Sequence, residues 1–426
     1  MGRTIDDLDD DRGDVTGPPP RPAARAGRLG VLAGRDFRIF YAGYVTSLVG
    51  SAMSQVALTF AVLGSGGTPA DLGFIFAASV LPLVAFMLGG GVVADRIGRR
   101  PVMLAADATS LAVQATLAAA LFAGRPPIWL FVVLAALLGA SEAFFIPALG
   151  GLVPAVAPGG RLADANALVG VARAAASVAG PALAGVLIAV TRPAAAIAVD
   201  AATFGVSLVT LALIRVPPVR HGGQPAWRDL ADGLAQLTGQ RWLAIITVQF
   251  ALFNLLTWAP YLLLGPIMAR DYLGGASAWG TVLGTGALGS VLAGLTLIGR
   301  RPQRPLLVAV AGTLGYPVPC LLLCLHAPEF AVAAGAALAG AGSAVFNTCF
   351  QTVLQERVPA GLLSRTTALV STGAYALGAA GYAVIGPVAG IVGPAPMLGF
   401  GAAYATASSL VVLALPAIRS VRRAPA

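Results

Sequence analysis

The chain has 426 residues, of which 57% are apolar and only 11% are charged, with a formal net charge of +9 at pH 7 and a mean hydropathy of +0.83. About a quarter of the residues of an ordinary soluble domain are charged, so this composition excludes a soluble globular protein and indicates that lipid surrounds most of the chain. The positive charge implies no nucleic-acid partner, because basic loops facing anionic lipid suffice to explain it.

Residues 1–36 differ from the rest of the chain. They include the stretch DDLDDDRGDVTGPPPRPAARAGR, which is acidic at first and then rich in proline and arginine. Such a segment cannot bury enough apolar surface to order itself, so we predict a disordered tail. A regulatory or partner-binding role for this tail stays open beside that of a plain solvated segment.

Apolar runs then follow one another almost to the end of the chain. Each is long enough to cross a hydrocarbon layer of about 30 Å as a helix of roughly 20 residues. The twelve predicted membrane spans are about 38–63, 72–94, 101–123, 128–150, 164–190, 194–215, 243–268, 277–298, 305–326, 329–354, 363–390 and 395–418.

The arginines test this number of spans. All 27 basic residues are arginine, and 23 of them fall in the tails and in the loops that lie on the side of the N-terminus. Only Arg125, Arg192 and Arg270 fall in the opposite loops, and Arg173 falls within a span. Cytoplasmic loops are enriched in Lys and Arg, so this distribution predicts an even number of spans with both termini in the cytoplasm.

The pentapeptide Ile-Gly-Arg-Arg-Pro occurs twice, at 97–101 and again 201 residues later at 298–302. Both copies follow an even-numbered predicted span. A duplicated unit of six spans would place them so, and because six is even the two halves would run parallel through the membrane. Parallel repeats of this kind characterise one large class of transporters, which bind their substrate between the halves.

The same offset holds elsewhere in the chain. Residues 135–170 align with 336–371 without a gap, and 13 of the 36 aligned positions are identical. Two glycine pairs in the fifth and eleventh spans also obey it: Gly180 with Gly381, and Gly185 with Gly386. Two apolar sequences can match at some positions by composition alone. Composition does not explain why these matches share a single offset of 201 residues with an identical pentapeptide.

The first pentapeptide extends into a longer motif. Residues 91–100, GVVADRIGRR, resemble the loop 2–3 signature of the major facilitator superfamily, G-x-x-x-D-R-x-G-R-R. The matching positions are Gly91, Asp95, Arg96, Gly98, Arg99 and Arg100. The resemblance covers about residues 35–418, and within the superfamily the chain looks like the branch of bacterial exporters for siderophores and macrolides.

This resemblance implies an all-α membrane protein with twelve transmembrane helices, arranged as two parallel-repeat six-helix bundles in the bacterial inner (plasma) membrane. The predicted organisation is a disordered cytoplasmic tail at 1–36, an N-terminal six-helix bundle at 37–215, a central cytoplasmic linker at 216–241, a C-terminal six-helix bundle at 242–418 and a cytoplasmic tail at 419–426.

The resemblance also implies a latch between the halves, in which Asp95 meets the cytoplasmic start of span 11 near Ser364 and Arg365. Gly98 would allow the tight turn that this short loop needs. The second copy has Thr296 at the position of Asp95, so the latch would be one-sided. The alternative is an ordinary basic loop held on the cytoplasmic face.

Span 5 contains GPALAG, with Gly180, Pro181 and Gly185, which resembles the antiporter signature of exporters in this superfamily. Small residues allow helices to approach closely, and proline can bend a span. The final glycine pair of that signature is reduced here to Ala184 and Gly185. Ordinary packing of small residues therefore remains an alternative to an export-specific role.

Four charged residues lie within predicted spans, where ionisable groups are expensive and each is a candidate functional group. Glu142 and Arg173 lie near the midplane on consecutive spans, so we expect them to pair, and Glu142 is the first candidate for a proton-carrying carboxylate, with Arg173 tuning it. A purely structural salt bridge is the alternative. Asp107 shares a helical face with Arg100 and is expected to be a structural partner of the inner loop. Asp200 is the reserve candidate, for either packing or proton relay.

In the superfamily fold, spans 1, 4, 7 and 10 line the central cavity, and each carries polar or aromatic residues at helical spacing here. Interhelical hydrogen bonding is the alternative role for any single one of them. The predicted cavity residues are Tyr44, Ser51, Gln55, Glu142, Asn254, Trp258, Tyr261, Asn347 and Gln351, with Ser47, Ser141, Thr257 and Ser343 on the same stripes.

The sequence therefore predicts a secondary transporter, not an enzyme, that exports a small amphipathic molecule, such as a drug, siderophore or secondary metabolite, in exchange for protons. It has no phosphate-binding G-x-x-x-x-G-K-[ST] motif, no metal-binding pattern and no disulfide framework, so we expect no cofactor or metal, and we expect it to act as a monomer in the bilayer. The alternatives are an importer or facilitator of a small solute, and a transporter-like sensor without flux.

Overall fold

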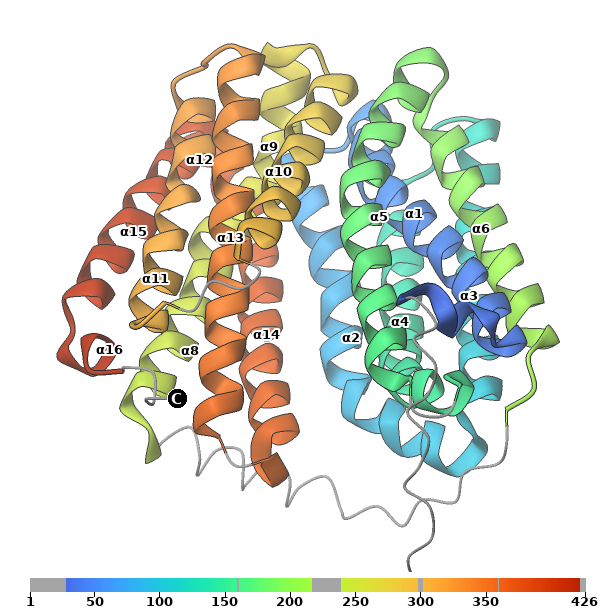
Figure 1. Ribbon diagram of the computed structural model, residues 1–426. Helices are drawn as coiled ribbons and strands as arrows, with labels where there is room; N and C mark the ends of the chain where they lie inside the picture. The colour runs from blue at the N-terminus through green and yellow to red at the C-terminus, as the bar shows by residue number, and fades with distance from the viewer. Residues whose placement is uncertain (1–27, 159–160, 217–238, 298–301, 359, 422–426) are drawn as a thin grey trace, which may run out of the picture.

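A computed structural model describes residues 28–158, 161–216, 239–297, 302–358 and 360–421, and these are almost entirely helical. Figure 1 shows two bundles of helices side by side, with the first half of the chain in one and the second half in the other. The first bundle contains α1 (Arg35–Gly64), α2 (Pro69–Ile97), α3 (Arg99–Ala123), α4 (Ile128–Val156), α5 (Leu162–Val190) and α6 (Pro193–Leu213), preceded by the short η1 (Arg28–Ala33).

The second bundle is built from more pieces. Its first span runs through α8 (Arg241–Phe253), the π-helix η2 (Asn254–Trp258), α9 (Ala259–Met268) and the π-helix η3 (Ala269–Leu273). The remaining elements are α10 (Ala276–Leu297), α11 (Pro305–Gly312), η4 (Thr313–Gly315), α12 (Pro317–Cys324), α13 (Glu329–Arg357), α14 (Ala360–Val392), α15 (Pro394–Ala414) and α16 (Pro416–Arg419).

Each of the twelve predicted spans corresponds to one helix or to one run of consecutive helices. Eleven of them are long and apolar enough to cross a membrane, and the remaining span lies in α14, whose apolar part among the described residues is Ala376–Val392. The prediction of an all-helical, multi-pass membrane protein is therefore confirmed.

The helix ends follow local rules. The Thr68 hydroxyl accepts a hydrogen bond from the Asp71 N–H at 3.2 Å, while the Asp71 carboxylate accepts one from the Thr68 N–H at 2.8 Å, which is a capping box at the start of α2. Gly98, between α2 and α3, has a φ of 105°. Glycine adopts this conformation without strain, so the predicted tight turn at Gly98 is confirmed.

Arg100 holds the end of another helix. Its Nε donates to the carbonyl oxygen of Leu211 at 2.8 Å and its Nη2 to that of Ala212 at 2.5 Å. These carbonyls lie at the C-terminus of α6, where they lack intrahelical donors and where the helix dipole favours a positive charge. Arg100 thus fixes α6 against α3, and its guanidinium turns to the end of α6 rather than to Asp107, with which it shares a helical face.

The apolar core shows how the two bundles meet. We call the end of the molecule near Arg35, Leu213 and Arg241 the linker end, and the opposite end the far end. At the far end one core includes residues of both bundles, among them Leu72, Ala184, Ile267 and Ile385. At the linker end each bundle has a core of its own, around Phe37, Met103 and Leu152 in the first and Leu243, Leu306 and Val353 in the second. The bundles are therefore joined at the far end.

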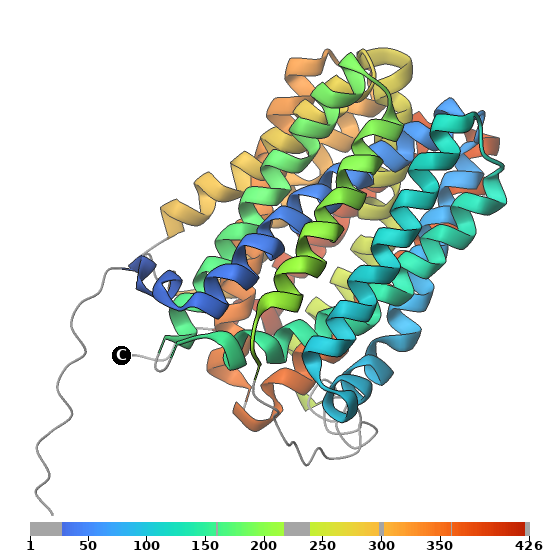
Figure 2. The same cartoon turned by 90° about the vertical axis from the view of Figure 1, so that its right-hand side faces the viewer.

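Two glycine contacts make this junction possible. Gly386 of α14 packs against Gly73 of α2, and Gly185 of α5 packs against Gly280 of α10, each so closely that a Cβ would meet the opposite backbone. Both contacts lie in the far half of the helices. In Figure 2, turned so that the first bundle faces the viewer, the helices of this bundle extend from one end of the molecule to the other.

The glycine contacts also reveal the internal repeat. Gly139 packs against the backbone of Ser79 as Gly340 packs against that of Gly286, and Gly180 meets Ala52 as Gly381 meets Ala259. The offset of 201 residues predicted for the fourth and fifth spans is confirmed at these glycines. In the first two spans of each half, however, the contacting residues are 207 apart. Residues 298–301 of the second pentapeptide lie outside the described residues.

Candidate functional site

A cavity lies between the two bundles. It consists of two adjoining chambers of about 270 Å³ and 390 Å³. Both chambers are bounded by Ala52, Gln55, Pro181, Trp258, Leu262 and Leu283, which come from α1, α5, the η2–α9 segment and α10. Residues from both halves therefore enclose one continuous space, as expected for the substrate site of a parallel-repeat transporter.

The first bundle gives this cavity its charge. Glu142 of α4 borders the smaller chamber together with Gln55 and Ser79, and its side chain is exposed to that space. Among the described residues, none forms a hydrogen bond or ion pair with the Glu142 carboxylate, and neither chamber is bordered by an arginine or histidine. The cavity thus has a negative centre and no fixed cation to balance it.

The second bundle supplies an aromatic wall. The Trp258 ring lies 5.8 Å from the Tyr261 ring and 5.9 Å from the Tyr316 ring, measured between centroids, and the latter pair meets edge to face. The Tyr261 ring also lies 5.3 Å from that of Trp279. Tyr382 of α14 joins the wall and contacts Phe76 of α2 across the two halves. Such faces bind apolar bodies and attract cations.

The π-helix η2 positions two residues that border the cavity, Asn254 and Trp258. The buried residues Phe37 and Phe40 of α1 match the buried Leu243 and Ile246 of α8 at an offset of 206 residues, whereas the glycine contacts pair Ala52 with Ala259 at an offset of 207. The seventh span therefore contains one residue more than the first between these points. The π-helix at 254–258 absorbs that residue, as such bulges commonly do at functional sites, and it presents Asn254 and Trp258 to the cavity.

Arg173 lies elsewhere than expected. Its Nε donates to the hydroxyl of Tyr44 on α1 at 2.8 Å. The predicted pair between Glu142 and Arg173 is absent from the described residues, so this expectation is wrong for the conformation seen here. Tyr44 is itself buried in the linker-end core of the first bundle and borders neither chamber, so the prediction that it lines the cavity is also wrong.

Asp200 of α6 is fully buried between α1 and α3. One carboxylate oxygen accepts a hydrogen bond from the Gln114 amide at 2.5 Å, and the other lies 3.4 Å from the Ser51 hydroxyl and 3.3 Å from the Thr203 hydroxyl. The same Gln114 amide lies 2.7 Å from the Ser54 hydroxyl. Ser51, predicted to line the cavity, instead turns toward Asp200.

Asp107 is the other buried carboxylate. It is 1% exposed, it lies beside Ser207 of α6, and its Oδ2 atom has no partner among the described residues. Nearby, the hydroxyls of Ser110 and Ser141 lie 2.9 Å apart. Asp107 therefore belongs to the interior of the first bundle, and its predicted association with the inner loop is wrong.

The predicted residues of span 10 divide between two spaces: Ser343 borders the larger chamber of the central cavity, whereas Asn347 and Gln351 border a smaller chamber beside it. Asn347 and Gln351 of α13 line a space of about 180 Å³ on the linker side of the second bundle, together with Phe250 and Asn254. The Asn347 amide donates to the carbonyl oxygen of Ser343 at 3.0 Å. Asn254 also borders the central cavity, so the two spaces adjoin at that residue.

The structure describes only some of the residues in the motifs of loop 2–3 and span 5. The side chains of Asp95, Ser364 and Arg365 lie outside the described residues, so the latch remains a prediction. Arg99 donates to the carbonyl oxygen of Gly151 at 2.5 Å and so joins α3 to α4. In span 5, Pro181 borders both chambers, and its two neighbouring motif glycines make the close contacts described above.

Sequence reasoning missed Tyr316, Trp279 and Tyr382 of the cavity wall, because they lie on spans 9, 8 and 11, which were not expected to line it. It also missed Gln114. A lone amide within an otherwise apolar span is a signal that could have been used, since such a group must find a polar partner in the membrane.

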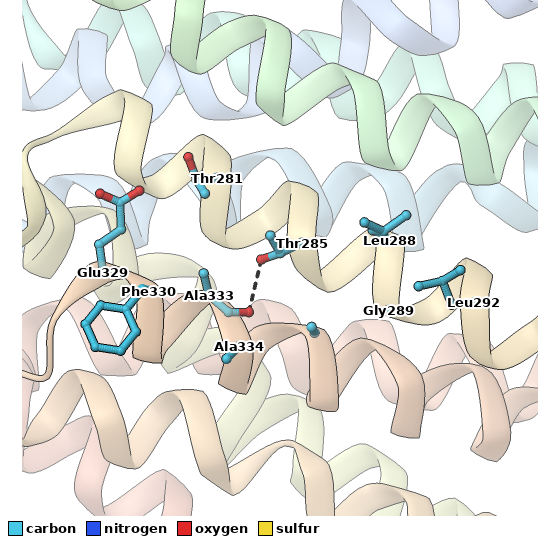
Figure 3. Close-up of a pocket in the computed structure, with 10 residues that line it drawn as sticks. Thr281, Thr285, Leu288, Gly289, Leu292, Glu329, Phe330, Ala333 and Ala334 are labelled. Atoms are coloured by element: carbon cyan, nitrogen blue, oxygen red, sulfur yellow. Dashed lines mark hydrogen bonds between the residues drawn. The ribbon is translucent and has the colours of Figure 1, made fainter.

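Another hollow lies on the outside of the second bundle, between α10 and α13 (Figure 3), with a volume of about 630 Å³. Its walls are mainly apolar and include the exposed side chains of Leu288, Leu292 and Phe330, with Glu329 at one end. The hydroxyl of Thr285 is already bonded to the Ala333 carbonyl oxygen at 3.1 Å. Exposed apolar walls suit contact with lipid chains, so we place the functional site in the central cavity.

Comparison with known proteins identifies relatives of this architecture. The sequence profile of the Major Facilitator Superfamily matches residues 39–382. The chain is 25% identical over 406 residues to the multidrug efflux pump Tap of Mycobacterium tuberculosis, covering 92% of this chain and 96% of that protein. It is 24% identical over 282 residues to macrolide efflux protein A of Streptococcus pyogenes, covering 65% of this chain and 69% of the relative.

Solved structures share the fold at low identity. The nucleoside transporter NupG superposes with a TM-score of 0.71 at 11% identity, over 89% of this chain and 98% of that one. A bacterial homologue of the human lysosomal transporter Spinster, captured inward-facing and unoccupied, superposes with a TM-score of 0.66 at 13% identity, over 92% of this chain and 98% of that one.

Proposed function

The chain belongs to the major facilitator superfamily of transporters, and we propose that it exports a small amphipathic molecule in exchange for protons. It is a multi-pass membrane transporter of the efflux-related branch, not an enzyme. One observation carries the finer proposal: the central cavity sets a single unpaired carboxylate, Glu142, opposite a wall of aromatic rings.

The chemistry of this cavity favours a particular solute. A carboxylate without a fixed counter-charge attracts a cation or a proton, and the rings of Trp258, Tyr261 and Tyr316 offer apolar and π surfaces to a bulky body. Amide side chains in the walls, such as Gln55 and Asn254, can hydrogen-bond a polar group of the same solute. Either a proton or the positive end of a substrate can neutralise Glu142. If only one of them can occupy this carboxylate at a time, binding of the substrate on one side of the membrane would require release of the proton there. The two would then move in opposite directions.

The shape of the molecule supports alternating access. The two bundles share a core at the far end and have separate cores at the linker end. The arginine distribution supports a cytoplasmic position of both termini, and with that orientation this arrangement would be the inward-facing state of the transporter. Rocking of one bundle against the other would open the far end and release the substrate outside the cell.

The direction of transport is the second part of the proposal. The names of the two efflux relatives support export, as does the GPALAG segment of α5. The structural neighbours support the fold alone. An importer or facilitator would move the solute without outward pumping, and a sensor would bind it without moving it.

Inverted membrane vesicles distinguish these possibilities. With the cytoplasmic face outward and an inside-acid gradient, an exporter is expected to accumulate a fluorescent lipophilic cation such as ethidium, and a protonophore should release it. Binding without accumulation in proteoliposomes would favour the sensor. Equilibration that ignores the proton gradient would favour the facilitator.

The latch gives a prediction at the loop between α2 and α3. Asp95→Asn removes the charge that would hold the two halves together and should leave insertion normal while slowing ethidium export at least tenfold. Transport by purified, reconstituted protein at matched protein content measures the effect. Thr296→Val, at the equivalent position of the second copy, is the control and should export normally. Undiminished export by the Asp95 variant would contradict the latch.

A further inference from the structure

The first bundle contains a polar cluster that the export mechanism does not use. We call it the Asp200 cluster, and its members come from three helices: Ser51 and Ser54 of α1, Gln114 of α3, and Asp200 and Thr203 of α6. Asp200, Gln114 and Ser54 are 0%, 3% and 7% exposed, and none of the cluster borders either chamber of the central cavity. The cluster is therefore a closed site behind the cavity wall.

The cluster is rich in oxygen and carries one uncompensated charge. Its oxygen atoms comprise two carboxylate oxygens, three hydroxyls and the amide oxygen of Gln114, whose position relative to the amide nitrogen is exchangeable by a flip. No arginine or histidine is paired with Asp200 among the described residues; its hydrogen-bond partners are all neutral. A buried carboxylate in the membrane must be neutralised, by a proton or by another cation.

The second bundle provides an internal comparison, because it fills the equivalent space without a carboxylate. By the offsets established above, Asp200 corresponds to Gly401 and Ser54 to Tyr261. Thr257, which corresponds to Gly50, donates to the Gly401 carbonyl oxygen at 3.0 Å. In the second bundle, the Tyr261 ring thus lies at the depth that corresponds to the serine hydroxyls and Asp200 in the first bundle.

This comparison shows that the fold does not require an acid at that level. Replacing a buried charged group by well-packed apolar residues is commonly neutral or stabilising, so the Asp200 cluster contributes nothing to packing that a ring could not supply. We propose that the Asp200 cluster binds a small monovalent cation, a proton or Na⁺, at a site distinct from the substrate cavity. Carboxylate, hydroxyl and amide oxygens are the ligands that hard cations prefer.

The charged groups around the cluster are few. Glu142 of α4 is the acidic residue that borders the neighbouring cavity, so its charge and that of Asp200 would repel each other. Asp107 lies two helical turns from Gln114 along α3, and Arg173 of α5 is engaged with the Tyr44 hydroxyl of α1. Occupation of the Asp200 cluster by a cation would relieve the repulsion at Glu142, which links the closed site to the cavity. This proposal stands whether the cavity serves export, import or binding alone.

The test measures cation binding without any substrate. Purified full-length protein in detergent is unfolded thermally at mildly alkaline pH in NaCl, with choline chloride keeping the ionic strength constant. If Na⁺ is the occupant, the midpoint temperature should rise saturably with Na⁺ in the unaltered protein and stay flat in Asp200→Asn. If the proton is the occupant, infrared difference spectra between acidic and alkaline buffer should show a carboxyl band that Asp200→Asn lacks and Glu142→Gln keeps.

Two further variants make the result decisive. Ser51→Ala removes one oxygen of the cluster and should shift the cation concentration or pH at half-effect several-fold, while Asp107→Asn, which removes the other buried carboxylate, should leave it unchanged. Identical responses of Asp200→Asn and the unaltered protein to both Na⁺ and pH overturn the proposal. Should Asp200→Asn not fold, an unchanged half-effect point in Ser51→Ala overturns it instead. Loss of transport alone bears only on the proposed export.

Discussion

Glutamine in place of Glu142 is expected to abolish export driven by a proton gradient while leaving substrate binding largely intact. The amide keeps the shape and hydrogen-bonding capacity of the side chain but cannot exchange a proton. Because Glu142 is the carboxylate that faces the central cavity, the energy of the gradient would no longer reach the substrate. Ethidium flux in proteoliposomes, with and without an imposed pH gradient, measures the loss, which should exceed about 100-fold for uphill transport, the lower end of the range for losing a group that moves a proton.

The chain offers a matched control for this substitution. Glu329 lies at the end of the outer hollow between α10 and α13, away from the central cavity, so Glu329→Gln should transport normally. Counterflow of ethidium should persist in Glu142→Gln, because exchange of substrate for substrate needs no net proton movement. If this variant still accumulates ethidium against its gradient, the proton carrier lies elsewhere, and Asp200 is the next residue to replace.

Leucine in place of Gly386 should prevent the two bundles from closing at the far end. A Cβ at Gly386 would lie 2.5 Å from the carbonyl oxygen of Pro69 and 3.2 Å from the Cα of Gly73. Backbone atoms of α2 cannot yield that much space without separating the helices. The state in which the far end is closed would be lost, and with it the proposed transport cycle, although each bundle would still fold because helix α14 accepts leucine readily.

Gly390 is the control for this second prediction, since it lies one helical turn further along α14 and a Cβ there meets nothing within 4 Å. Gly390→Leu should transport normally. Accessibility is read from Gln55→Cys in a chain whose three native cysteines are replaced by alanine, using a membrane-impermeant thiol reagent added from outside. Gly386→Leu should raise labelling strongly. Normal transport and unchanged labelling in Gly386→Leu would show that close approach at this point is not needed.

The two halves share a plan but differ in chemistry. The first half has the cavity-facing carboxylate and the buried polar cluster, whereas the second half has the aromatic wall and a π-helix that turns Trp258 inward. A duplicated fold provides the same helix contacts twice, as the glycine pairs show, so the chemical roles can diverge without loss of the architecture. In the proposed exporter, one half would handle the cation and the other would hold the apolar body of the substrate.

Part of the candidate site was predictable from the helical spacing of polar residues together with the spans that the resemblance to the superfamily implied. Gln55, Glu142, Asn254, Trp258 and Tyr261 border the central cavity as the helical spacing predicted. Spacing identifies a face of a helix, and in these spans the polar face is also the one turned toward the other bundle. The same reasoning gave wrong partners elsewhere, because a face can be turned toward a neighbour within its own bundle, as Ser51 is toward Asp200.

The sequence by itself determined the membrane class, the twelve helices and the duplication. These follow from constraints that act locally: each span must be apolar over the thickness of the bilayer, arginines mark one side of the membrane, and an internal offset records the repeat. Only the tertiary structure decided that Arg173 binds Tyr44, that Arg100 holds the end of α6, and that Asp200 is enclosed by Gln114 and hydroxyls. Such partners depend on the rotation and crossing of packed helices, which are set by close contacts between residues far apart in the chain, glycine on backbone above all, and no local pattern encodes them.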